Sequence, residues 1–173
     1  MKKTMVLFIL IILFYVIIGH VSAEKLIPDE AIRLRVIPNS NDTYDQEVKI
    51  KVRDMIQEEM YDLLKDTKGI EEARERIVLN LPKIEDEVNS LLKNENYNLG
   101  YNVSFGSHYF PEKQYKGVTY DAGMYESLLI TLGKGEGNNW WCVLFPPLCL
   151  IEAEESTEVE YKSFIAEMIE KFM

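Results

Sequence analysis

The chain has 173 residues, and its 19 Lys and Arg stand against 29 Asp and Glu, which gives a formal charge of −10. Affinity for nucleic acid comes from Lys and Arg that neutralise phosphates, so a chain this acidic is not expected to bind it. With 47% apolar and 28% charged residues, the composition excludes a disordered chain and leaves enzymes, binding proteins and signals open.

The first 23 residues have the three parts of a secretory signal peptide. Two lysines precede the apolar run Met5–Ile18, and small residues follow up to the predicted cleavage site between Ala23 and Glu24. The alternative is an uncleaved anchor, but a helix as long as this run rises only about 21 Å, short of the roughly 30 Å hydrocarbon core. Both interpretations place residues 24–173, which hold every acidic residue, outside the membrane as one domain.

The first half of this domain is expected to form one strand followed by helices. Ala31–Ile37 alternates apolar and basic residues, which predicts a strand, and turn residues follow it. A helix then starts at Asp42 or Thr43 and runs through about Lys65 with apolar residues at the helical period. A second helix is expected at about Ile70–Leu79. Its inward-facing residues are expected to be Ile70, Ala73, Ile77 and Val78.

Pro82 falls within the apolar pattern that continues after this second helix. Proline interrupts helices because it lacks an N–H, so we expect the second helix to end near Pro82 and Asn80 to cap a third one. The third helix would carry an apolar stripe of Ile84, Val88, Leu91 and Leu92. A single kinked helix is the alternative.

From residue 101 onward the apolar pattern changes to the alternation of strands. The predicted strands are Tyr101–Phe105, Gln114–Tyr120, Tyr125–Leu132 and Trp140–Phe145, and Gly133–Asn139 is expected to be the turn of a hairpin. Thr157–Phe172 predicts an amphipathic C-terminal helix. Separate blocks of helices and strands favour an α+β fold, with helices packed on one face of a mainly antiparallel sheet of about four to five strands.

The body has two cysteines, and an even number in an exported chain favours a disulfide. A bond between Cys142 and Cys149 would close a small loop around Pro146-Pro147 and would stabilise the fold by roughly 2–3 kcal/mol. Two buried thiols are the alternative. A zinc site is disfavoured because the close CxxC spacing and further ligands are missing.

No residue pattern in the chain favours catalysis. His108 is the one histidine of the body, and a Cys–His hydrolase would pair it with Cys142. The enzymatic alternative is a cell-wall hydrolase that uses His108 or Glu126 as its acid–base group. The glycines of residues 133–137 lack the GK[ST] sequence and the following helix of a phosphate loop. We therefore expect no enzyme, and no metal, cofactor or small-molecule substrate.

Residues 140–151 form an uncharged block that contains both tryptophans of the chain, Trp140 and Trp141. Burial of most of this block in the core is one interpretation. Neighbouring residues of a strand point to opposite faces, so the other is that one Trp lies in the core and one at the surface. Exposed aromatic residues mark partner-binding surfaces, and Pro146 and Pro147 would stiffen such a surface.

Several motifs resemble those of the stage II sporulation protein R family. They are Ile32–Ser40, Asp45-Gln46, Lys49–Asp54, Tyr109–Lys113, Ala122–Leu128 and Gly133–Cys149. The resemblance covers about residues 30–150. The family usually has Ala where Pro38 stands and Pro where Asp121 stands, and both departures lie in predicted turns.

The resemblance implies a signalling protein of endospore-forming bacteria. Members of the family are made in the forespore and exported into the space between the forespore and mother-cell membranes. There they activate a membrane-embedded aspartic protease, which cuts the precursor of sigma factor E. Such a ligand needs a binding face and no chemistry of its own. A membrane-tethered structural protein of the septum is the alternative if residues 5–21 stay uncut.

The candidate partner-binding residues follow from this implication and from the distribution of aromatic, proline and basic residues. They are Tyr109, Phe110, Pro111, Trp140, Trp141, Phe145, Pro146, Pro147, Arg33, Arg35 and Arg53. The arginines are included because bases are scarce in this acidic body. Solvated helix or strand faces and internal ion pairs are their alternative roles.

Overall fold

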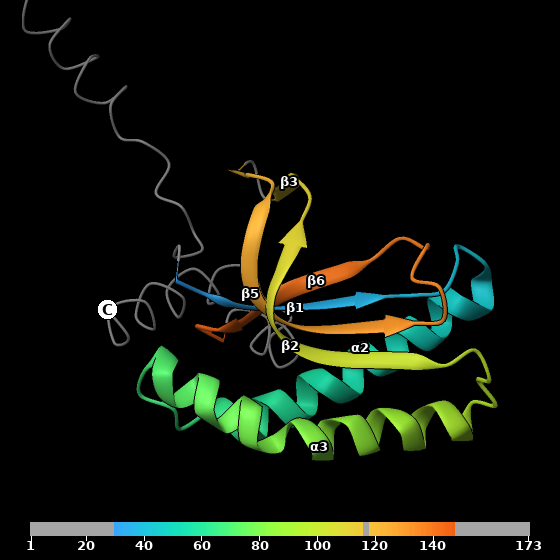
Figure 1. Cartoon of the computed structure of the whole chain (residues 1–173), viewed down its shortest axis with the longest axis horizontal. Coiled ribbons are helices and arrows are strands. Elements are labelled where there is room, and N and C mark those ends of the chain that lie inside the picture. Colours follow the sequence, from blue (N-terminus) through green and yellow to red (C-terminus); the bar gives the residue numbers. More distant parts are fainter. Residues whose placement is uncertain (1–29, 116–117, 148–173) are drawn as a thin grey trace, which may run out of the picture.

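A computed structural model describes residues 30–115 and 118–147. Two long helices, α2 (Thr43–Leu64) and α3 (Ile70–Asn94), lie against one face of a four-stranded sheet (Figure 1). A second, two-stranded sheet rises above the opposite face. This arrangement confirms the predicted α+β fold with helices on one face. The predicted C-terminal helix, Thr157–Phe172, lies outside the described residues.

The four strands are arranged in the order β2–β5–β1–β6. Their bounds are β1 Ile32–Ile37, β2 Tyr101–Phe110, β5 Gly123–Leu132 and β6 Trp140–Phe145. β1 pairs parallel with β5 and antiparallel with β6, while β2 pairs antiparallel with β5. The sheet is therefore mixed, with two of its three pairings antiparallel.

The expected hairpin around Gly133–Asn139 is wrong. β5 and β6 do not pair with each other, because β1 lies between them and contacts both. The loop between β5 and β6 consequently crosses the end of β1. A local sequence pattern predicts strands but carries no information about a strand that inserts from far away in the chain.

The core lies between the sheet and the helices. Alternate residues of the two central strands are fully buried, namely Ile32, Leu34 and Val36 of β1 and Leu128, Ile130 and Leu132 of β5. The helices contribute Val48, Val52, Ile56, Met60, Leu64, Ala73, Ile77, Ile84, Val88 and Leu92. Each large apolar side chain among them stabilises the fold by about 1.5–3 kcal/mol on burial.

The predicted break near Pro82 is wrong, and the chain forms the single helix α3 that was the alternative. Pro82 lies on the exposed side of the helix, where its ring meets solvent rather than the core. Two residues earlier, the side chain of Asn80 donates a hydrogen bond to the Arg76 carbonyl at 2.8 Å instead of capping a new helix. Val78, expected to face inward, is 51% exposed because the buried stripe runs through Ile77 and Ile84.

The predicted strand Gln114–Tyr120 is two strands. β3 (Lys113–Tyr115) and β4 (Val118–Tyr120) pair antiparallel, with Tyr115 opposite Val118. Residues 116 and 117, between the two strands, lie outside the described residues.

The loop Gly133–Asn139, called here the β5–β6 loop, is held against the turn that follows β1. The Glu136 N–H donates to the Asn39 carbonyl and the Gly137 N–H to the Pro38 carbonyl, both at 3.1 Å. A Cβ atom on Gly137 would overlap the Ser40 carbonyl oxygen, so only glycine permits this approach.

Side chains complete the contact between these two segments. The Asn39 carboxamide oxygen accepts the Lys134 N–H at 3.1 Å, and the Asn41 carboxamide oxygen accepts the Asn138 N–H at 2.6 Å. The buried Lys49 ammonium donates to the Asn138 carbonyl at 3.1 Å. The turn after β1 and the β5–β6 loop both belong to the motifs that resemble the sporulation family. Much of their sequence thus has a structural role in joining β1 to β6.

Candidate partner-binding site

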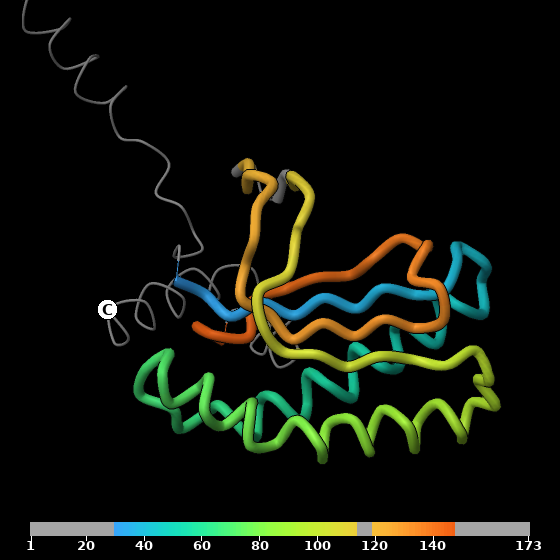
Figure 2. The backbone as a smooth tube through the Cα atoms, in the orientation of Figure 1, coloured from blue at the N-terminus to red at the C-terminus, as the bar shows by residue number. Residues whose placement is uncertain are grey.

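An arm projects from the sheet. It consists of Ser107–Tyr115 and Val118–Glu126, which are the ends of β2 and β5 together with the β3–β4 pair. The arm rises on the face of the sheet opposite the helices, and the tube of Figure 2 shows its two sides running next to each other. Gly106, with a φ of +155°, precedes the arm in β2, and this backbone conformation is rare for residues with a side chain.

An arginine lies at the centre of an aromatic cluster between the arm and the sheet. The Arg33 guanidinium carbon is 3.4 Å from the ring centroid of Tyr125, 5.6 Å from that of Phe110 and 5.8 Å from that of Trp141. Arg33 is only 4% exposed. A cation held this way against ring faces is stabilised by the negative charge of the π systems, and the effect is strongest away from water.

The rings of this cluster also contact one another edge to face. Phe110 meets Tyr125 at 5.9 Å and Trp141 at 6.4 Å between centroids, and Tyr120 meets Trp141 at 6.2 Å. Such T-shaped pairs are favourable beyond the area that they bury. We call Arg33, Phe110, Tyr120, Tyr125 and Trp141 the arginine–aromatic cluster. It fastens the arm to the sheet.

Arg35 lies next to this cluster and is also engaged within the protein. It donates to the Tyr109 carbonyl at 2.8 Å, and its guanidinium carbon lies 5.4 Å from the Phe110 ring. With the Asn139 amide turned to face it, the Asn139 oxygen accepts two further bonds from Arg35, at 2.8 and 2.6 Å. Burial lowers the pKa of Arg35 from its usual value. Within the protein, Arg33 and Arg35 therefore contact aromatic rings, a backbone carbonyl and an amide oxygen.

Trp140 and Trp141 point to opposite faces of β6, as strand geometry predicts. Trp140 packs against the core on the helix side, with the Arg53 guanidinium carbon 5.5 Å from its ring. Arg53 also forms an ion pair with Asp54 at 2.6 Å. The structure thus separates Arg53 and Trp140 from the other candidates.

Several candidate residues are buried within the protein. Phe110 is 2% and Phe145 is 3% exposed, and Pro146 and Pro147 are buried as well. These side chains support the fold and do not form a surface. The predicted bond partner Cys149 and the predicted cleavage site at Ala23 and Glu24 lie outside the described residues, so both remain predictions.

The exposed part of the candidate site is on the outer side of the arm. Tyr109 is 59% exposed and stands directly opposite Met124, which is 62% exposed. Pro111 is exposed beside them. Met124 was not among the predicted residues, because only the register between β2 and β5 reveals that it adjoins Tyr109.

His108 and Glu126 lie on opposite faces of the sheet. The two ring nitrogens of His108 contact the hydroxyl oxygens of Ser104 at 3.2 Å and Ser127 at 2.8 Å on the arm side. Glu126 faces the helices and accepts two bonds from Arg74, at 2.6 and 2.9 Å. Burial, aided by the nearby positive charge of Arg35, lowers the pKa of His108.

Cys142 is also on the helix side, since it pairs with the buried Leu34. It therefore lies on the other face from His108, and the two cannot form a Cys–His pair. The described residues contain no cluster of three or more side chains suited to a metal ion. They also contain no helix long and apolar enough to cross a membrane.

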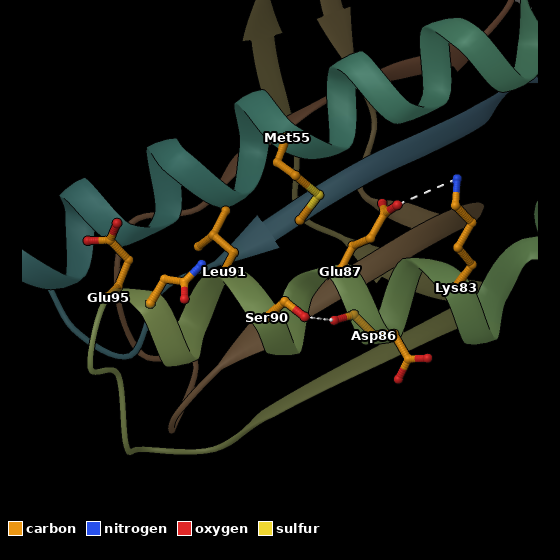
Figure 3. A pocket seen from close by; sticks show the side chains of 8 residues that line it. Met55, Lys83, Asp86, Glu87, Ser90, Leu91 and Glu95 are labelled. Atoms are coloured by element: carbon orange, nitrogen blue, oxygen red, sulfur yellow. Dashed lines mark hydrogen bonds and ion pairs between the residues drawn. The ribbon is translucent and has the colours of Figure 1, made fainter.

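Two hollows lie in the described part of the chain, and the smaller one adjoins Tyr125 of the arginine–aromatic cluster. The larger hollow, of about 470 Å³, lies between α2 and α3, and Met55 and Leu91 are its apolar lining residues (Figure 3). Its rim is charged, and Lys83 there contacts Glu87 at 3.5 Å. The other, of about 270 Å³, adjoins the Arg74–Glu126 pair, and Met124 lines its edge. None of the predicted partner-binding residues lines either hollow. Glu126, the acid–base candidate of the hydrolase alternative, lines the smaller one, and His108 does not.

The fold and the site define a class of small α+β protein that presents an aromatic arm beside a mixed sheet. The model of the stage II sporulation protein R family matches residues 28–155, and the chain belongs to this family. It is 39% identical over 171 residues to the stage II sporulation protein R of Bacillus subtilis (strain 168), covering 92% of this chain and 76% of that relative. No solved structure matches it. The family membership gives the chain a role in sporulation.

Proposed function

We propose that this chain is an exported sporulation signal that activates a membrane-embedded aspartic protease, which then cuts the precursor of sigma factor E. The observation that carries the proposal is the family membership over residues 28–155. The site of action would be the space between the forespore and mother-cell membranes. No nucleic acid and no small-molecule substrate enters this proposal.

The arm is the part of the molecule best suited to contact the protease. Tyr109 and Met124 form an exposed, uncharged pair on its outer side. The arginine–aromatic cluster holds the arm against the sheet from the inner side, so the surface is ordered before a partner arrives. Pre-ordering reduces the entropy lost on binding and supports affinity. A ligand that binds only the active state of its partner shifts the partner toward that state.

The proposal is tested by co-expressing the full chain with the protease and the sigma factor precursor, and following precursor cleavage. Replacing both Tyr109 and Met124 by Ala should leave a folded, exported protein whose triggering is reduced at least about tenfold. The control replaces by Ala two exposed residues of α3, Val78 and Leu79, whose exposed fractions are 51% and 71%. Cleavage that does not depend on the chain at all would refute the function. Equal losses in both variants would refute the role of the arm.

Export and the disulfide belong to the same proposal and have their own measurements. Mass spectrometry of the exported protein should show a chain that begins at Glu24, whereas an intact leader would favour a membrane-tethered protein. The exported protein is treated with a thiol-alkylating reagent before and after reduction. If its mass shows that Cys142 and Cys149 are alkylated only after a reductant is added, the two form a disulfide.

A further inference from the structure

β2 forms one edge of the main sheet, and β5 is its one strand neighbour among the residues that the structure describes. The strand runs for ten residues without a Lys, Arg, Asp, Glu or Pro. Proteins commonly protect exposed edges with such residues, because an open edge offers unpaired backbone groups to other chains. The edge of β2 has none of these protecting side chains.

The hydrogen-bond register identifies which backbone groups of β2 point outward. The Gly133 N–H donates to the Gly100 carbonyl at 2.9 Å, so this pair is of the hydrogen-bonded type. The pairing with β5 continues without a shift, and bonded and non-bonded pairs alternate along an antiparallel ladder. The N–H and C=O groups of Tyr101, Val103, Phe105 and Ser107 therefore point away from β5.

Within the described part of the chain, no backbone or side-chain group bonds to these outward groups. The next residue in the series, Tyr109, has its carbonyl occupied by Arg35 at 2.8 Å. The open edge thus extends over alternate residues from Tyr101 to Ser107 and ends at the exposed Tyr109 of the arm.

We propose that the outer edge of β2 receives an extended segment of the partner protein as a fifth strand of the sheet. This inference rests on the proposed function, because it takes the protease as the partner. Another extended backbone matches the spacing of a row of alternating N–H and C=O groups, and strand addition is a recurring mode of peptide recognition.

Charge near the edge favours a particular kind of segment. Glu85 and Asp86 of α3 are exposed, and their negative charge adds to burial in raising the pKa of the Tyr101 hydroxyl, which places them close to the start of β2. A basic side chain on the segment at this end would complement them. A second copy of the chain fits less well, because each copy carries a charge of −10 and the two would repel.

The test uses proline at outward-facing positions, where it removes an N–H and blocks the added strand without breaking the bonds to β5. Ser107→Pro is compared with Ser107→Ala, and Val103→Pro with Val103→Ala, in case either position tolerates proline poorly. Each variant is first checked for an unchanged circular dichroism spectrum. Both proline variants should weaken binding to vesicles that carry the protease at least about tenfold, while the alanine variants bind like the wild type.

Hydrogen exchange of the full chain on the same vesicles separates the two proposals. Slowed exchange of the Val103, Phe105 and Ser107 amides together with precursor cleavage supports both. Cleavage without slowed exchange overturns strand addition and leaves the function standing. Slowed exchange without cleavage supports strand addition and overturns the function. Slowed exchange without vesicles, with a doubled mass in solution, would show that a second copy occupies the edge and would also overturn the proposal.

Discussion

The guanidinium carbon of Arg33 lies 3.4 Å from the ring centroid of Tyr125, and this stacked pair joins β1 at the centre of the sheet to the arm. The two residues are far apart in the sequence. A charged residue is expensive to bury without compensation. The surrounding rings contribute to that compensation, and the alternating apolar and basic residues of β1 place this charge among aromatic rings on the arm side of the sheet.

The coupling between these two residues is measurable. We expect Arg33→Met and Tyr125→Leu to show a coupling free energy of about 1–2 kcal/mol in a double-mutant cycle of urea unfolding, since the cation is desolvated. The control cycle uses Lys65 and Tyr61, where an exposed ammonium lies 5.9 Å from the centroid of a partly buried ring and the coupling should stay below about 0.5 kcal/mol. Equal coupling in the two cycles would contradict the stacking argument.

The β5–β6 loop should tolerate no side chain at Gly137. Gly137→Ala places a methyl group against the Ser40 carbonyl and should lower the free energy of unfolding by about 1–3 kcal/mol. Gly69→Ala is the control, because its nearest neighbour would be 3.9 Å away. If Gly137→Ala is as stable as that control, the loop does not hold β1 and β6 together.

Tyr97 carries a buried hydroxyl that has no hydrogen-bond partner among the described residues. Burial, with a contribution from the charge of Asp45, raises the pKa of Tyr97 to about 12. The raised value means that the neutral ring stabilises the fold fully below about pH 10 and that this stability is lost as the pH rises toward 12.

Replacing Tyr97 by Phe should therefore raise the free energy of unfolding at neutral pH by about 1 kcal/mol. The variant should also lack the last tyrosine to ionise in an alkaline absorbance titration. An unchanged titration curve would show that another tyrosine accounts for the highest pKa.

His108 should make stability depend on pH in the mildly acidic range. Its pKa is lowered from the model-compound value of 6.5 by burial and by Arg35, so the unfolded chain binds a proton there more readily than the folded chain. The stabilising contribution is complete above about pH 6.5 and is lost as the pH falls from there toward the lowered pKa. The free energy of unfolding, measured with urea, should fall less for His108→Asn than for the wild type when the pH is lowered from neutral to mildly acidic. Parallel losses in the two proteins would assign the pH dependence to other groups.

Local patterns predicted the elements whose own sequence carries a clear apolar period, wherever their partners lie in the chain. The alternation in Ile32–Ile37 and the helical period of Thr43–Leu64 were sufficient for β1 and α2, because each presents one apolar stripe to the core. The pattern around Pro82 was misleading, since a proline on the solvent side of α3 interrupts one backbone bond and leaves the buried stripe intact.

The candidate site was predicted in part. Trp141 of the uncharged block and Arg33 of β1 do meet, but the alternation within one strand could not reveal that these two residues share a face with Tyr125. That information lies in the register between strands distant in sequence. The same register was needed to find Met124 beside Tyr109, and to place His108 and Glu126 on opposite faces.

The position of β1 between β5 and β6 has a consequence for how the chain folds. β1 is the first described strand to be synthesised, yet both of its partners lie beyond residue 122. Until those residues are available, its apolar face can meet α2 and α3 but its backbone has no strand to pair with. Contacts between segments so distant in sequence are slow to form, because a long loop must close first. A nascent chain shorter than this lacks both strand pairings of β1, and such an unfinished sheet fits the export that we propose.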